Sequence, residues 1–235
     1  MIEKSIILIP TLHEKDNLEK LIPAIFNLMA DVSILVVDDD SKDGTPELVS
    51  SMSARFKNLY LLSRENDHGY GRSSIDGFKF AIEKGHGAVI TMDADFSHDL
   101  NAVPAMLEKL KYSDVVVGSR YIHGGGVKNW NLARRILSRF ANFYVKLLLN
   151  LPVKDATTGF NGYRIEALQK LKPEDIRSEG YAFLVETKFN LSKAGCRFSE
   201  YPIIFSERRE GRSKMSTKII WESIWLPWKL QLNKK

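Results

Sequence analysis

The sequence holds a single cysteine, Cys196, among its 235 residues. One cysteine excludes an internal disulfide and a structural zinc site built on several cysteines, so a reducing compartment is the natural expectation. Long apolar runs are also missing, since none approaches the roughly 18–20 residues that cross a membrane. The apolar stretch 6–9 stops at Pro10, too short for the hydrophobic region of an export signal. We therefore predict neither a membrane span nor export by such a signal.

The glycine-rich loop of dinucleotide-binding proteins is absent as well. The first predicted strand ends in Ile9-Pro10-Thr11, where that loop would place G-x-G-x-x-G. A later Gly69-Tyr70-Gly71 comes too far along the chain and lacks the third glycine. A dinucleotide-dependent oxidoreductase is therefore excluded.

Composition and charge are those of a soluble globular protein. The chain is 44% hydrophobic and 27% charged, and its length can bury one sizeable core. Its net charge of +5, from 34 basic and 29 acidic residues, favours anionic ligands or surfaces. A basic cluster at 208–218 would fit nucleic acid, but acidic pairs elsewhere would repel phosphate unless a metal intervened. We expect no nucleic-acid partner.

The first half of the chain alternates strand and helix patterns with short connections. This alternation is the signature of a doubly wound, mostly parallel α/β sheet flanked by helices. Strands are predicted near 5–9, 33–37, 59–63, 88–92 and 114–118, and helices near 17–29, 46–56, 72–84 and 102–111. In the first helix, Asp16 and Glu19 have the spacing of a capping-box variant, and Pro23 predicts a kink or an early end.

Asp93-Ala94-Asp95 is the most informative stretch, because it directly follows the predicted buried strand 88–92. Two carboxylates one residue apart at the carboxyl end of a strand form a hard-oxygen site, suited to Mg²⁺ or Mn²⁺ carrying a pyrophosphate. A capping or turn role for the two aspartates is the alternative. The surrounding sequence must decide between them.

A second acidic cluster, residues 38–40, follows the predicted strand 33–37. Since ligands bind at the carboxyl ends of the strands in an open parallel sheet, both clusters are expected to line one crevice. Asp43-Gly44 is typical of a turn, and Thr45-Pro46 of a helix start, so Asp43 is predicted to be structural.

After Gly124-Gly125-Gly126 the regular alternation of strand and helix patterns gives way to a different composition. A helical pattern at 131–150 carries Arg134, Arg135 and Arg139 beside apolar residues, which predicts a basic amphipathic helix or, alternatively, a core helix with a solvated basic face.

At 217–235, three tryptophans fall on one helical stripe ahead of several lysines: Trp221, Trp225 and Trp228. That pattern fits a helix lying in a membrane interface. A packed terminal helix or a subunit interface remains the alternative, because Pro227 interrupts the pattern.

Several motifs together resemble the inverting family 2 glycosyltransferases of the GT-A fold. They are residues 9–14, 37–45, 92–98 and 118–121. Within that family, later stretches look like polyprenol-phosphate (dolichol-phosphate) mannose synthases: residues 125–130, 155–160 and 208–214. The resemblance covers nearly the whole chain in the right order. It implies a GT-A catalytic domain at 1–215, followed at 216–235 by the tryptophan-rich helix.

The resemblance also implies roles for individual residues. The nucleoside side would comprise Pro10, Leu12, Glu14, Val37, Asp38 and Asp39, with Asp93 at the donor phosphates. The metal would be held by Asp93, Asp95 and Ser97. Arg120 and Arg134 would receive the acceptor's phosphate, and a basic loop with Arg208, Ser213 and Lys214 would cover the donor diphosphate, although Glu210 departs from the pattern of some relatives. Arg64 and Arg72 flank the donor or are simply exposed.

The activity implied by the resemblance is transfer of mannose from GDP-mannose to dolichyl or polyprenyl phosphate, with inversion and with Mg²⁺ or Mn²⁺ as cofactor. A membrane surface would be a partner, with the protein peripheral at the cytoplasmic face and a membrane subunit as a candidate recruiter. The alternative is a relative that uses another nucleotide-sugar, such as UDP-glucose, or a non-lipid acceptor.

Overall fold

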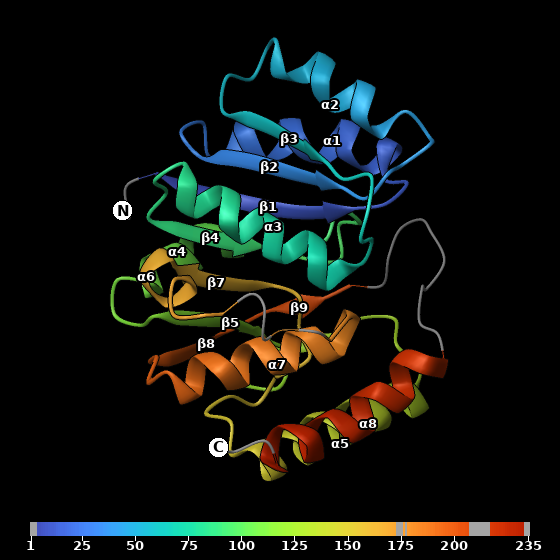
Figure 1. The fold of residues 1–235 in the computed structure, drawn as a ribbon, viewed down its shortest axis with the longest axis vertical. Helices are drawn as coiled ribbons and strands as arrows, with labels where there is room; N and C mark the ends of the chain where they lie inside the picture. Colours follow the sequence, from blue (N-terminus) through green and yellow to red (C-terminus); the bar gives the residue numbers. More distant parts are fainter. Residues whose placement is uncertain (1–3, 173–175, 177, 207–216, 233–235) are drawn as a thin grey trace.

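The computed structural model describes residues 4–172, 176, 178–206 and 217–232. Its centre is a seven-stranded sheet in the order β3-β2-β1-β4-β7-β5-β8 (Figure 1). The strands of this sheet are β1 (Ser5–Thr11), β2 (Ser33–Asp38), β3 (Leu59–Ser63), β4 (Ala88–Thr91), β5 (Val115–Ser119), β7 (Asn161–Arg164) and β8 (Phe198–Pro202). All neighbours run parallel except β7, which pairs antiparallel with both β4 and β5. The mostly parallel sheet predicted from the sequence is confirmed, with β7 inserted into it.

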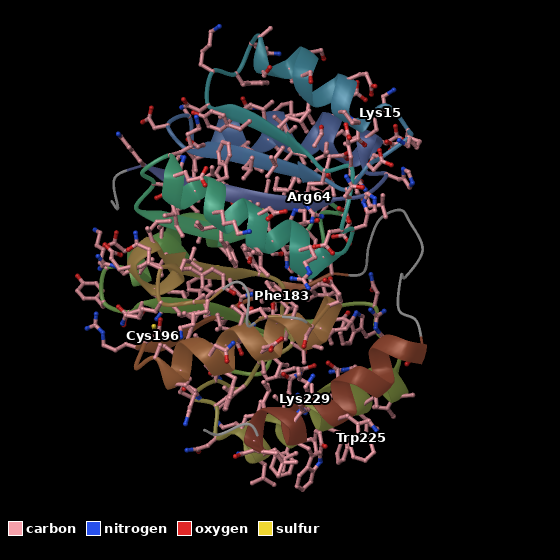
Figure 2. The ribbon with its side chains drawn as sticks, viewed as in Figure 1. Lys15, Arg64, Phe183, Cys196, Trp225 and Lys229 are labelled. Atoms are coloured by element: carbon pink, nitrogen blue, oxygen red, sulfur yellow. The ribbon has the colours of Figure 1, made fainter. Side chains whose placement is uncertain are left out.

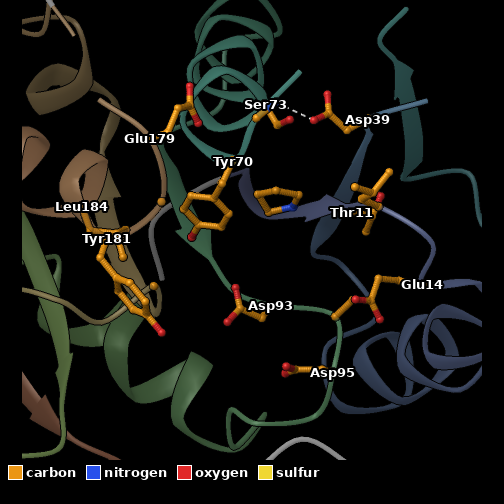
Figure 3. Close-up of a pocket in the computed structure, with 16 residues that line it drawn as sticks. Thr11, Glu14, Asp39, Tyr70, Ser73, Asp93, Asp95, Glu179, Tyr181 and Leu184 are labelled. Carbon is orange, nitrogen blue, oxygen red and sulfur yellow. Dashed lines mark hydrogen bonds between the residues drawn. The ribbon is translucent and has the colours of Figure 1, made fainter. Parts of the chain in front are cut away.

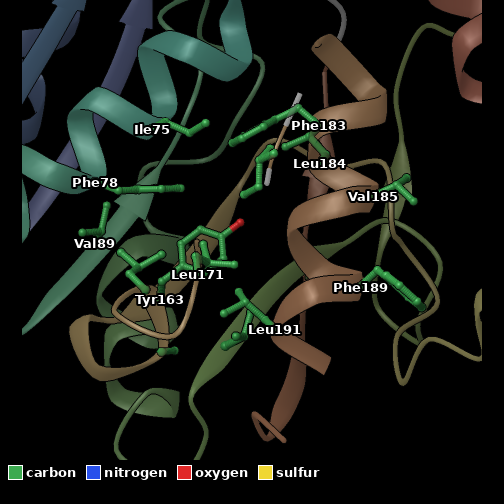
Figure 4. Packing of buried hydrophobic residues seen from close by; sticks show 14 of the residues in the cluster. Ile75, Phe78, Val89, Tyr163, Leu171, Phe183, Leu184, Val185, Phe189 and Leu191 are labelled. Carbon is green, nitrogen blue, oxygen red and sulfur yellow. The ribbon is translucent and has the colours of Figure 1, made fainter. Parts of the chain in front are cut away.

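Helices cover both faces of the sheet. They are α1 (Lys15–Leu28), α2 (Thr45–Ser53), α3 (Tyr70–Glu83), α4 (Ala102–Lys109), α5 (Leu132–Leu149), α6 (Ile165–Leu168), α7 (Gly180–Lys193) and α8 (Thr217–Leu232). Because successive strand residues point to opposite faces, Ile7 and Ile9 of β1 pack with α1 and α4, while Ile6 and Leu8 pack on the side of α3 and α7. In the core on the α3 and α7 side, Phe78 of α3 packs edge to face against the ring of Tyr163, with Phe183 of α7 nearby (Figure 4).

α5 and α8 lie side by side at the end of the molecule farthest from α2 (Figure 1). α8 also contacts α7, and Leu226 is buried there at 6% exposure. A short parallel pair, β6 (Gly126–Val127) and β9 (Ile204–Phe205), lies apart from the main sheet. In the part of the chain that the structure describes, no helix is both long and apolar enough to span a bilayer.

Two details of α1 differ from the sequence predictions. The helix begins after Glu14, whose carboxylate accepts a hydrogen bond from the Asn17 amide at 2.8 Å, so the Asp16–Glu19 capping box does not form. Pro23 does not end the helix, which continues to Leu28. The carbonyl that Pro23 leaves without a donor belongs to the exposed Glu19, where water can satisfy it, and the buried residues that follow hold the last turn against the core.

The start of α2 shows that Asp43 has a local structural role. Its carboxylate accepts hydrogen bonds from the backbone N–H and hydroxyl of Thr45, at 3.1 and 2.7 Å, and from the backbone N–H of Lys15 at 3.1 Å. Gly44, with φ of +89°, is the N-cap residue, and Thr45 is already the first helical residue. The Asp43 carboxylate therefore ties the start of α2 to the start of α1.

Candidate active site

A cavity of about 390 Å³ opens at the carboxyl edge of the parallel strands. β1, β2 and β4 each contribute residues from the point where the strand ends, and the starts of α3 and α7 complete the wall (Figure 3). The lining residues are Pro10, Thr11, Leu12, Glu14, Asp39, Gly69, Tyr70, Ser73, Asp93, Ala94, Asp95, Gly159, Glu179, Gly180, Tyr181 and Leu184. The expected crevice is therefore present, and both acidic clusters contribute to it.

Asp93 and Asp95 form the acidic end of the cavity (Figure 3). After Asp95 the backbone turns sharply, because Phe96 adopts a left-handed conformation with φ of +57°. This turn brings the backbone N–H of Ser97 to 3.0 Å from Oδ1 of Asp95, which fixes the orientation of the carboxylate. Asp95 is only 3% exposed, so its negative charge faces the cavity rather than open solvent.

His98 lies beside the other carboxylate and was not assigned a role from the sequence. Its ring stacks on Phe160, with centroids 4.8 Å apart, and its Nε2 lies 3.4 Å from Oδ2 of Asp93. The side chain is 1% exposed, so a close-packed pocket holds the imidazole in place. The only sequence signal for it was its position, five residues after Asp93.

The acidic end fits a divalent cation that is shared with a phosphorylated ligand. Among the described residues, no group of three or more His, Cys, Asp or Glu side chains forms a complete cage. Mg²⁺ is commonly bound by one or two carboxylates together with substrate phosphates, which matches Asp93 and Asp95. Ser97 does not line the cavity, but its hydroxyl is buried and finds no hydrogen-bond partner within the described part of the chain. The donor set is thus made of hard oxygens, as Mg²⁺ and Mn²⁺ require.

The cavity is also lined by Pro10, Leu12, Glu14 and Asp39, four of the residues predicted to face a nucleoside. The other two predicted residues, Val37 and Asp38, are fully buried and do not line the cavity, so their assignment to the nucleoside stays a prediction. Val37 points into the core on the α3 side. Asp38 accepts a hydrogen bond from the backbone N–H of Ser41 at 3.0 Å and thereby shapes the turn after β2.

Asp39 is held from behind by Arg64. The Arg64 Nη1 lies 2.5 Å from Oδ1 of Asp39, while its Nε lies 2.9 Å from Asp76 of α3. The second oxygen of Asp39 accepts the backbone N–H of Gly69 at 2.6 Å. Arg64 is 8% exposed, so it is not a free surface side chain but the centre of a buried ionic cluster. Arg72, by contrast, is about one-third exposed and lies 3.8 Å from Glu179.

Sequence reasoning missed one wall of the cavity, which the starts of α3 and α7 build. Glu179 accepts the backbone N–H of Gly71 at 2.7 Å. The two helix starts approach so closely that a Cβ on Gly69, whose φ is +142°, would lie 2.6 Å from the Glu179 carboxylate. Tyr70 lies between them and Asp93 (Figure 3). Burial, and then the charge of Asp93, raise the pKa of the Tyr70 phenol well above its usual value, so Tyr70 is a neutral hydrogen-bonding group.

Arg120, which the resemblance assigns to the acceptor's phosphate, is paired with a carboxylate in the structure. Its Nε and Nη2 lie 2.7 Å from the two oxygens of Asp155, and Nη2 also donates to the Thr157 hydroxyl at 2.9 Å. Burial alone would lower the pKa of Arg120, but the charge and hydrogen bonds of Asp155 outweigh it and raise that pKa. The side chain is 5% exposed and does not line the cavity. Arg120 is therefore a buried cation held by Asp155, and its assignment to the acceptor's phosphate stays a prediction.

Arg134 remains on the surface at the start of α5, where the Asn131 side chain caps the helix by accepting the Arg134 backbone N–H at 2.8 Å. Its guanidinium carbon lies 4.1 Å from the centre of the Trp130 ring. The predicted basic loop, with Arg208, Glu210, Ser213 and Lys214, lies outside the described residues.

Comparison with known proteins agrees with this geometry. The family model described as glycosyl transferase family 2 matches residues 6–172. The undecaprenyl-phosphate mannosyltransferase of Micrococcus luteus is 35% identical over 217 residues, covering 92% of this chain and 89% of the relative. The polyprenol monophosphomannose synthase of Mycolicibacterium smegmatis is 34% identical over 224 residues, covering 94% and 84%.

Among solved structures, glucosyl-3-phosphoglycerate synthase from Mycobacterium tuberculosis, in complex with Mn²⁺, UDP and phosphoglyceric acid, matches with a TM-score of 0.68. The match covers 98% of this chain and 78% of that structure at 15% identity, so it supports the fold alone. The mostly parallel sheet flanked by helices, the structural likeness and the family match together identify a glycosyltransferase of the GT-A fold. More specifically, the chain belongs to glycosyl transferase family 2.

Proposed function

We propose that this chain transfers mannose from GDP-mannose to dolichyl or polyprenyl phosphate, giving a polyprenyl β-mannosyl phosphate. The observation that carries the proposal is a single cavity lined by the carboxylate pair Asp93 and Asp95 and by the carboxylates of Glu14 and Asp39. The names of the two relatives, each a polyprenyl-phosphate mannosyl enzyme aligned over most of its length, support this choice of sugar and acceptor.

In this proposal the donor lies along the cavity. Carboxylate acceptors at Glu14 and Asp39 take hydrogen bonds from base N–H or ribose hydroxyl groups, and Asp39 is rigid because Arg64 and Gly69 hold both of its oxygens. Asp93 and Asp95 would hold Mg²⁺ or Mn²⁺, which would supply positive charge for a departing diphosphate. The solved structure of the same fold was obtained in complex with Mn²⁺ and UDP, which is consistent with the use of a divalent metal.

The reaction needs little from a general base. A phosphate monoester acceptor is already largely dianionic near neutral pH, since its second pKa is about 6. One of its oxygens attacks C1 of the sugar from the face opposite the diphosphate, so the new C1–O bond forms as the old one breaks and the anomeric centre inverts. The protein's task is to align acceptor and donor and to exclude water. Arg134, and the loop with Arg208 and Lys214, would supply positive charge around the two phosphorylated groups.

A polyprenyl tail stays in the bilayer, because each buried CH₂ contributes about 0.8 kcal/mol. We propose that the paired helices α5 and α8 bring the active site to the cytoplasmic face of a membrane. Apolar side chains on them are largely exposed, and Trp225 projects away from the body of the protein (Figure 2). These side chains are Leu132, Ile136, Leu137, Phe140, Phe143, Leu147, Trp225, Trp228 and Leu232, which we call the α5–α8 apolar surface.

Basic side chains accompany this surface: Arg135, Arg139, Lys146 and Lys229 are all exposed. Apolar bulk beside positive charge is typical of helices that lie on anionic bilayers. The same surface would also fit a membrane subunit that recruits the enzyme, which a vesicle experiment distinguishes. Trp221 belongs to α8, but its side chain lies outside the described part of the structure.

The donor and acceptor are tested by offering the protein GDP-mannose, UDP-glucose or GDP-glucose together with Mn²⁺ and a short-chain polyprenyl phosphate. Mannosyl phosphate lipid from GDP-mannose alone is the expected product. Preferred consumption of UDP-glucose would replace the proposed donor with the alternative one. Turnover of a donor only when a non-lipid acceptor is present would overturn the proposed acceptor.

A further inference from the structure

We infer that Trp130 is a positioning residue for the acceptor: its indole ring holds the Arg134 guanidinium where it can receive the acceptor's phosphate. The inference rests on the proposed function, because it concerns the same acceptor. Neither residue lines the donor cavity, so the role is separable from nucleotide binding.

The contact between the two side chains is close. The guanidinium carbon of Arg134 lies 4.1 Å from the centre of the Trp130 ring, within the range of a cation–π interaction. This distance is shorter than the 5.6 Å between the same ring and the guanidinium carbon of Arg120. Arg134 is on the exposed face of α5, so burial does not restrict its side chain. An exposed arginine loses rotamer freedom when it binds an anion, and a ring that orders it beforehand reduces that cost.

Trp130 is itself fixed by the protein around it. Its ring meets Phe205 of β9 edge to face, with centroids 5.5 Å apart at 70°, and Arg120 lies 5.6 Å from its centre. Backbone pairing holds this arrangement, since the N–H of Lys128 donates to the carbonyl of Phe205 at 2.8 Å. Arg120 is immobilised in turn by Asp155. The ring is therefore a rigid support rather than a mobile surface group.

The backbone before Trp130 is also closely packed. A Cβ on Gly125 would lie 2.5 Å from the carbonyl oxygen of Ser119, so only glycine allows this segment to lie against the end of β5. The segment between Arg120 and Trp130 is therefore packed at Gly125 against the backbone of Ser119 and Arg120.

Tryptophan at position 130 leaves a buried donor unsatisfied, and contact with a cation would explain why tryptophan stands there. Its indole N–H is buried and has no hydrogen-bond partner within the described part of the chain, a loss that phenylalanine would avoid. Tryptophan offers the most favourable aromatic face for a cation. An aromatic ring needed only to fill space beside Phe205 would not require the unsatisfied donor.

A double-mutant cycle tests the role. Trp130→Leu, Arg134→Ala and the double variant are compared with the wild-type protein, using the KM for short-chain polyprenyl phosphate and the Kd of GDP-mannose by calorimetry. We expect Trp130→Leu to raise the acceptor KM about two- to fivefold with unchanged GDP-mannose affinity. In the Arg134→Ala background the same substitution should add little, and Trp130→Phe should recover most of the wild-type KM.

Thermal unfolding of each variant shows whether it is folded. An equal effect of Trp130→Leu with and without Arg134, or a parallel loss of GDP-mannose affinity, would overturn the inference. If transfer from GDP-mannose is not detected, the same cycle is measured on direct binding of short-chain polyprenyl phosphate. Coupled binding losses would then support the role of Trp130 while the proposed donor fails, and absence of any binding would overturn both proposals.

Discussion

The guanidinium of Arg120 is paired side by side with the carboxylate of Asp155, with Nε and Nη2 each 2.7 Å from one carboxylate oxygen. The Arg120 backbone N–H also donates to Asp155, at 3.0 Å. Asp155 is fully buried and Arg120 nearly so, which makes this a buried ion pair joining the end of β5 to the segment before β7. The pair holds the Arg120 guanidinium in place.

Removing one partner of this pair should destabilise the fold. Asp155→Ala leaves a buried guanidinium without its counter-charge, and breaking a buried pair in this way typically costs about 3–5 kcal/mol. Urea unfolding followed by circular dichroism measures the loss. Glu108→Ala, which removes an exposed ion pair with Lys111 at 2.7 Å, is the control and should leave the free energy of unfolding nearly unchanged. Similar losses for both variants would contradict the structural role of Asp155.

Lys188 should make stability depend on pH. This lysine is fully buried in α7, where its ammonium donates to the Thr158 carbonyl at 3.2 Å, and burial lowers its pKa to about 7. Between about pH 7 and the unfolded value near 10.5, the unfolded chain binds more protons, so the free energy of unfolding should rise with pH. Lys188→Met should lack this contribution, giving a shallower pH dependence in urea unfolding between pH 7 and 10. Parallel curves for the two proteins would show that Lys188 does not titrate as described.

Arg64 should affect donor binding through Asp39. Arg64→Lys keeps a positive charge but cannot reach Asp39 and Asp76 together as the guanidinium does. Losing a hydrogen bond to a charged group is worth about 1.5–3 kcal/mol, so we expect GDP affinity to fall roughly tenfold or more. Arg164→Lys, at an exposed pair with Glu166, is the matched control for calorimetry. Unchanged GDP affinity in Arg64→Lys would separate Asp39 from the donor site.

The α5–α8 apolar surface should bind vesicles that contain anionic lipid. Trp225→Ala combined with Phe143→Ala removes two largely exposed aromatic side chains, and we expect weaker co-sedimentation with vesicles at low salt. Tyr112→Ala removes an equally exposed aromatic ring that follows α4, outside this surface, and serves as the control. Salt should weaken wild-type binding because basic residues contribute to it. If the wild-type protein stays in the supernatant, recruitment by a membrane subunit becomes the better account.

Much of this architecture could be predicted from residue patterns. Apolar strands followed by turn residues and amphipathic helices identified β1 to β5 and α1 to α4, and acidic residues after strands identified the edge at which the cavity opens. β7 could not be predicted in the same way, because Asn161-Gly162-Tyr163-Arg164 has neither the apolar run nor the alternation of a strand. Its antiparallel place between β4 and β5 is set by tertiary pairing.

The site was less predictable than the fold, because side-chain direction and long-range pairing are not visible in local spacing. Val37 and Asp38 directly precede Asp39 in the sequence, yet only Asp39 lines the cavity. Glu179 reaches the cavity through a contact with Gly71, 108 residues earlier in the chain. The carboxylate that pairs with Arg120 belongs to Asp155, 35 residues further along the chain.

The most direct test of the proposed activity is product formation by the wild-type protein and by Asp95→Asn. Each is incubated with GDP-mannose, Mn²⁺ and a short-chain polyprenyl phosphate, with and without excess chelator, and the lipid product is identified by mass spectrometry. We predict mannosyl phosphate lipid from the wild-type protein with metal. Chelator should abolish it, and the folded Asp95→Asn should lose it by orders of magnitude, because a carboxylate beside the departing diphosphate is removed. Full product formation in chelator, or by Asp95→Asn, would contradict the account.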